Sequence, residues 1–194
     1  MSRSALDVES AALLRSSALD GEDTTWAAGK TAAEVWGACG RGDLMLRLAG
    51  RMAVPSTPER AAVILAACDC AEIALPRFDM RCPGRGVSEA LDTTRQYARG
   101  LATIDDVRAA AASVANEADY AYAPAAVYAA AVYAAGGTAA IIVGFAGIGA
   151  AAHAAASEAA YECGDYSAGA AMLRRCADIV RRHLPAPPRK PGPT

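Results

Sequence analysis

The sequence has few aromatic residues and almost no pattern typical of strands. Phe, Trp and Tyr make up 6% of the 194 residues, and β-branched residues are clustered only in the short run Ile141–Val143. A protein built mainly from sheets is therefore excluded. Alanine dominates, and it is the best helix former. The sequence predicts an all-α fold, a single-domain, alanine-rich helical bundle over residues 1–184 followed by a proline-rich flexible tail over 185–194.

A strong charge of one sign, an export signal and a cysteine framework are also missing. The formal net charge is −2, too small to favour nucleic acid or an anionic membrane as a partner. The first twenty residues contain several charged side chains and lack the apolar core of a signal peptide. The six cysteines include no CxxC pair. We therefore expect a cytoplasmic protein whose cysteines are reduced.

The segment Ser56–Pro76 is expected to be the buried central helix of the bundle, from about Thr57 to Leu75. Thr57 can act as the N-cap, and Pro58 fits the first turn, where its missing N–H is tolerated. Apolar residues point in all directions around this helix, which is typical of a buried helix. Asp69 and Glu72 form its one polar stripe.

Capping residues mark the starts of other helices. Thr31 with Glu34 matches the capping box, and Thr103 with Asp106 is predicted to open a helix from Ile104 to about Tyr122. Asp43 and Ser88 are predicted to be N-caps, and Gly100 is predicted to end a helix.

The last helix is predicted to run from Ser167 to His183 and to carry a solvated basic face. This face contains Arg174, Arg175, Arg181 and Arg182. Arg174 is expected to pair with Asp178 at i, i+4, and one of the four arginines could reach the stripe on the central helix.

The tract Tyr120–Ser157 contains no Asp, Glu, Lys or Arg. A membrane span is one interpretation, because an uncharged apolar stretch of this length can cross a bilayer. Alanine contributes little transfer energy, however, so a tightly packed pair of alanine-rich helices is the favoured interpretation.

Motifs that carry chemistry are weak. Gly29–Thr31 resembles the end of a phosphate-binding loop but lacks its first glycine and preceding strand. Cys68 and Cys70 are two apart, so on a helix they point away from each other and cannot grip one metal. Only two histidines are present, His153 and His183, and no serine or cysteine of the chain has the sequence context of a catalytic nucleophile. We expect no enzyme activity, no metal and no cofactor.

Several motifs resemble the all-helical immunity proteins of bacterial polymorphic toxin systems. They lie between Trp26 and Pro185. In chain order they are Trp26–Cys39, which includes the GKT of residues 29–31, then Arg41–Leu44, Arg60–Pro76 (RAAVILAACDCAEIALP) and Cys176–Pro185 (CADIVRRHLP). Trp26, Trp36, Asp69 and Glu72 stand in these motifs. The resemblance implies a non-catalytic cytoplasmic protein that binds and neutralises a cognate protein toxin.

If that toxin is a nuclease, acidic residues at loops and helix starts should cover it. The candidates are Glu22, Asp23, Asp43, Asp79, Asp105 and Asp106. Two alternatives stay open, a small-ligand-binding protein or enzyme with a pocket near Trp26, Trp36 and Asp69, and a membrane-associated protein using Tyr120–Ser157. The oligomeric state also stays open.

Overall fold

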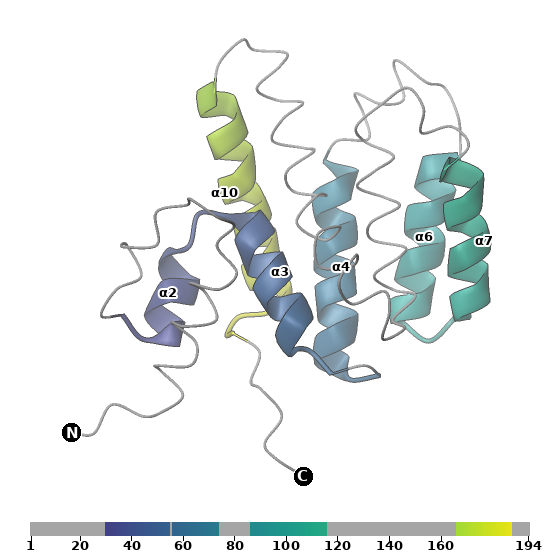
Figure 1. The fold of residues 1–194 in the computed structure, drawn as a ribbon, viewed down its shortest axis with the longest axis horizontal. Helices are drawn as coiled ribbons and strands as arrows, with labels where there is room; N and C mark the ends of the chain where they lie inside the picture. The colour runs from purple at the N-terminus through teal and green to yellow at the C-terminus, as the bar shows by residue number, and fades with distance from the viewer. Residues whose placement is uncertain (1–29, 55, 74–85, 116–165, 188–194) are drawn as a thin grey trace.

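The computed structural model describes residues 30–54, 56–73, 86–115 and 166–187. These residues form six helices and no strand, which confirms the all-α prediction for this part of the chain (Figure 1). The helices are α2 (Ala32–Ala38), α3 (Gly42–Met52), α4 (Pro58–Glu72), α6 (Gly86–Ala98), α7 (Ile104–Ala115) and α10 (Tyr166–His183).

The central position of α4 is confirmed. It packs against α3, α6 and α10, while α7 packs on the far side of α6 (Figure 1). Thr57 is its N-cap, with Oγ1 accepting a hydrogen bond from the backbone N–H of Arg60, and Pro58 lies in the first turn. The helix ends at Glu72 with Ile73 as C-cap, so it is slightly shorter than predicted.

Small side chains let α4 and its neighbours approach closely. Five alanine and cysteine residues of α4 are buried, together with Val63 and Ile64. On α10, Cys176 and Ala177 are fully buried, and the Cys70 thiol donates to the backbone carbonyl of Cys176 at 3.7 Å. The core is therefore filled by close helix contact as much as by large side chains.

Two capping boxes are present, the predicted one of Thr31 and Glu34 and a second one of Thr103 and Asp106. Thr31 and Glu34 bond each other's backbone N–H groups at the start of α2, and Thr103 and Asp106 do the same at the start of α7. Gly100 follows α6 with a φ of 74°, the left-handed conformation expected of a glycine that ends a helix. Ser88 is not an N-cap, because α6 already begins at Gly86.

The short helix α2 is fixed to the end of α10 by two reciprocal contacts. The Trp36 indole N–H donates to the Leu184 carbonyl at 3.0 Å. Arg181 Nη1 donates to the Trp36 and Cys39 carbonyls at 3.2 and 2.8 Å. Arg181 therefore satisfies backbone carbonyls at the end of α2, which lack partners within their own helix.

No helix in the described ranges combines the length and apolar character needed to cross a bilayer. The tract Tyr120–Ser157 lies outside the described residues, so the choice between its two interpretations stays a prediction.

The four described cysteines, Cys39, Cys68, Cys70 and Cys176, are free and buried. Burial raises the pKa of the Cys68 thiol from 9.0 to about 12.

This shift predicts a loss of stability at high pH. Above pH 9 the unfolded state releases the Cys68 proton while the folded state keeps it. The free energy of unfolding should therefore fall by about 1.4 kcal/mol per pH unit between the two pKa values. Urea unfolding of wild type and Cys68→Ala across this range isolates the effect, since other titrating groups cancel in the difference. Equal slopes for the two proteins would contradict the prediction.

Candidate functional site

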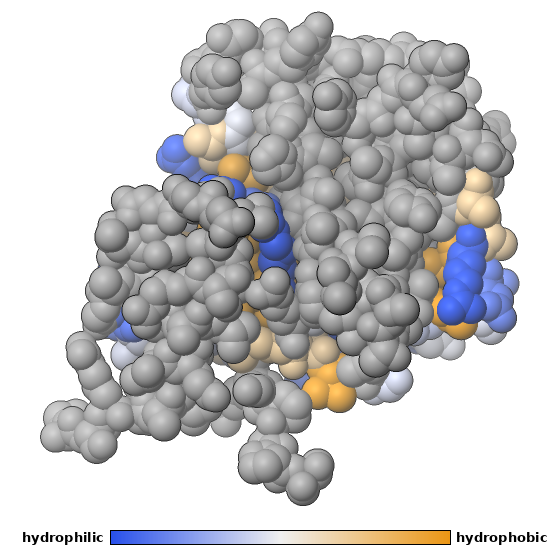
Figure 2. Space-filling model, in the orientation of Figure 1, coloured by the Kyte–Doolittle hydropathy of each residue, from blue (hydrophilic) through white to orange (hydrophobic). Residues whose placement is uncertain are grey.

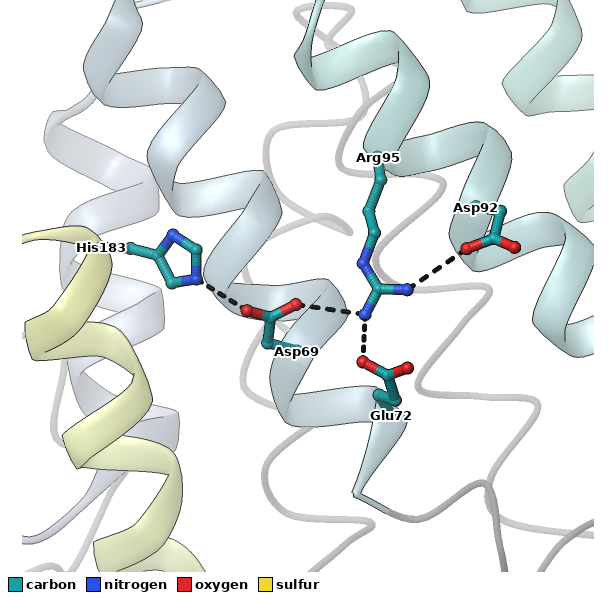
Figure 3. A network of polar contacts seen from close by, with 5 residues as sticks. All are labelled: Asp69, Glu72, Asp92, Arg95 and His183. Atoms are coloured by element: carbon teal, nitrogen blue, oxygen red, sulfur yellow. Dashed lines mark hydrogen bonds and ion pairs between the residues drawn. The ribbon is translucent and has the colours of Figure 1, made fainter.

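A network of polar side chains joins three helices around the stripe on α4 (Figure 3). Asp69 accepts from Arg95 Nη2 of α6 at 3.1 Å through one oxygen. Its other oxygen lies 2.8 Å from Nε2 of His183 at the end of α10. Glu72 and Asp92 bind the two terminal nitrogens of Arg95 at 2.5 and 3.4 Å. We call these five residues the Arg95 network.

Arg95 is the centre of this network, with only 14% of its side chain exposed. Burial by itself lowers the pKa of its guanidinium, but the hydrogen bond to Asp69 and the charge of Glu72 outweigh burial and raise the pKa. The cation is thus held in place by surrounding carboxylates, as charge-assisted hydrogen bonds require.

The partners of the stripe differ from those expected. The contact to Asp69 from the last helix comes from His183, and the arginine that binds both Asp69 and Glu72 comes from α6. The predicted pair of Arg174 with Asp178 is also wrong, because Asp178 binds Arg181 at 2.7 Å.

The network contains a histidine beside a carboxylate, an arrangement also found in catalytic triads. Such a triad needs a nucleophile on the other ring nitrogen. Among the described residues, no serine or cysteine is hydrogen bonded to His183. No group of three possible metal ligands occurs in the same ranges. What the geometry does show is a tie between α4, α6 and α10.

The alternative of a ligand pocket near Trp26, Trp36 and Asp69 gains no support from the described residues, because Trp36 and Asp69 make different kinds of contact. Trp36 is in the hydrophobic core, whereas Asp69 is in the Arg95 network. Trp26 lies outside the described residues.

Two of the acidic candidates are on the described surface, both in the first turn of α7. Asp105 is 82% exposed and pairs with Arg108 of the same helix at 2.9 Å. Asp106 is exposed, and its hydrogen bonds from Thr103 lower the pKa of its carboxyl. Three further candidates lie outside the described residues, namely Glu22, Asp23 and Asp79.

Asp43 requires a correction. It is not an N-cap, because α3 begins one residue earlier, after Arg41. Its side chain is fully buried, so it is not part of the exposed surface on which the sequence placed it. Arg41 binds both carboxylate oxygens at 2.9 and 2.7 Å, and Arg47 lies 3.5 Å from one of them. Because Asp43 is the second residue of α3 and not its N-cap, its carboxylate binds the two arginines on either side of it in the sequence.

Fold and network together define an all-α bundle whose central polar cluster ties three helices together. The family described as Imm-5 like putative immunity protein matches residues 54–177, and the chain belongs to this family. The match covers α4, α6, α7 and most of α10, whereas α2 and α3 lie before it. No curated protein and no solved structure matches the chain.

Proposed function

We propose that this protein binds and neutralises a cognate toxin domain of a bacterial polymorphic toxin system, in the cytoplasm and without catalysis. Family membership over residues 54–177 is the observation that carries this proposal. An immunity protein of this kind acts by covering a surface of the toxin, so its function depends on a stable scaffold and on exposed recognition residues.

The described scaffold suits that task. The Arg95 network ties α4, α6 and α10 to one another, which limits the reorganisation needed on binding. Asp105 and Asp106 sit at the start of α7, fixed by its capping box. We propose them as contacts for a basic part of the toxin, together with Glu22, Asp23 and Asp79.

Co-expression with the product of the adjacent toxin gene tests the function. Growth should be rescued, and an inactivated toxin domain should form a complex with the purified protein. Failure of both would overturn the proposal.

The charge-reversal variant Asp105→Lys tests the proposed acidic contact. It should weaken toxin binding about tenfold, chiefly through slower association at low salt. Glu89→Lys is the matched control, because Glu89 is also an exposed first-turn carboxylate but belongs to α6, which runs opposite to α7. Equal affinities of the two variants would exclude Asp105 as a specific contact.

A further inference from the structure

The outward face of α10 carries a row of arginines. Arg174, Arg175 and Arg182 are exposed, and we call these three residues the basic stripe. Figure 2 shows hydrophilic surface on the left of the view, where α10 lies in Figure 1, and on the right, where α7 lies. Arg175 and Arg182 are seven residues apart, hence on the same face and about 10 Å apart along the axis.

In the part of the chain that the structure describes, the fold does not use these charges. Within the described ranges, no ion pair or hydrogen bond involves the side chains of the basic stripe. The nearest carboxylate along the helix, Asp178, is bound to Arg181. Other arginines are engaged, and they are Arg41, Arg47, Arg60, Arg95, Arg108 and Arg181.

The helix dipole explains only part of the stripe. Cations are favoured in the last turn of a helix, and Arg182 lies there. Arg174 and Arg175 lie near the middle of α10, more than one turn from its end, where the dipole has little effect. Two adjacent cations in that position repel each other, and the helix dipole does not offset this repulsion.

We propose that the basic stripe is a docking surface for an acidic protein surface, namely a carboxylate-rich part of the toxin. This inference rests on the proposed function. Charge complementarity identifies the partner, because three arginines that pair with no carboxylate in the described ranges present a local positive field in a chain whose net charge is −2. Arginine also binds carboxylates through two parallel hydrogen bonds, which fixes orientation. The negative net charge disfavours nucleic acid as the occupant.

The test is the double variant Arg175→Glu/Arg182→Glu. Arg174 is left intact because its stem lies close to Gly40, where an added Cβ would be 3.2 Å from Arg174 Cγ. Binding of an inactivated toxin domain is measured by biolayer interferometry at low and high salt. We expect association to slow about tenfold or more at low salt, with a smaller difference at high salt. Unchanged circular dichroism and melting temperature establish that the variant is folded.

The control is Arg99→Glu, which removes an exposed arginine from the end of α6. The neutral double variant Arg175→Gln/Arg182→Gln should fall between wild type and the Glu variant. The inference is overturned if the Glu variant binds as wild type does, if Arg99→Glu is equally defective, or if the wild type binds duplex DNA through the stripe more tightly than it binds the toxin domain. If a folded Glu variant rescued growth and bound the toxin domain with unaltered affinity, the basic stripe would not be the docking surface, but the proposed function would still stand.

Discussion

Replacing Asp43 with alanine is expected to lower the free energy of unfolding by about 3–5 kcal/mol. The Asp43 carboxylate is fully buried between Arg41 and Arg47. The Arg47 side chain is itself only 11% exposed, and among the described residues its Nε has no hydrogen-bond partner. Without the carboxylate, Arg47 would be a buried cation with no counter-charge, which is far more costly than the loss of an exposed ion pair.

Urea unfolding of Asp43→Ala and of the control Asp105→Ala compares the free energy lost with a buried carboxylate to that lost with an exposed one. Both residues are first-turn aspartates bound to an arginine, so the helix dipole acts equally on both. The Asp105–Arg108 pair is exposed, and its loss should change stability by less than about 1 kcal/mol. Similar losses in the two variants would contradict the argument.

Local sequence signals predicted the helices well. Thr57 and Pro58 fixed the start of α4, and the capping boxes fixed the starts of α2 and α7, because these signals act between residues three or four positions apart. The same reasoning could not rank the acidic candidates. Asp43 and Asp105 occupy the same position in their helices, and only the tertiary structure decides that the first is buried and the second exposed.

The Arg95 network shows the same limit. The stripe of Asp69 and Glu72 was visible in the sequence, and a basic partner was expected. Which cation reaches it depends on the side-by-side placement of α4 and α6, which no local pattern encodes. The spacing of Asp92 and Arg95 at i, i+3 was the one available signal, yet it describes an ordinary pair on a helix surface. That Asp178 binds Arg181 and not Arg174 also required the structure, because Asp178 has four arginines three or four positions away along the helix.

Gly42→Ala is expected to destabilise the protein by about 1–3 kcal/mol or more through overpacking. A Cβ at Gly42 would lie 2.5 Å from the Cβ of Cys176, 2.6 Å from the backbone nitrogen of Ala177 and 2.7 Å from the backbone carbon of Cys176. Two of these atoms are backbone, so no change of rotamer relieves the clash. Helices α3 and α10 would have to move apart, and this movement would also disturb the buried Asp43 beside Gly42.

Gly37→Ala is the matched control for this substitution. Gly37 also lies within a helix, and an added Cβ there meets nothing within 4 Å. This variant should be stabilised by up to about 1 kcal/mol, because alanine is the better helix former. Thermal and urea unfolding of the two variants should therefore change in opposite directions. Parallel changes would mean that α3 and α10 do not touch at Gly42. Close packing of α3 on α10 would then not explain why glycine stands beside the buried Asp43.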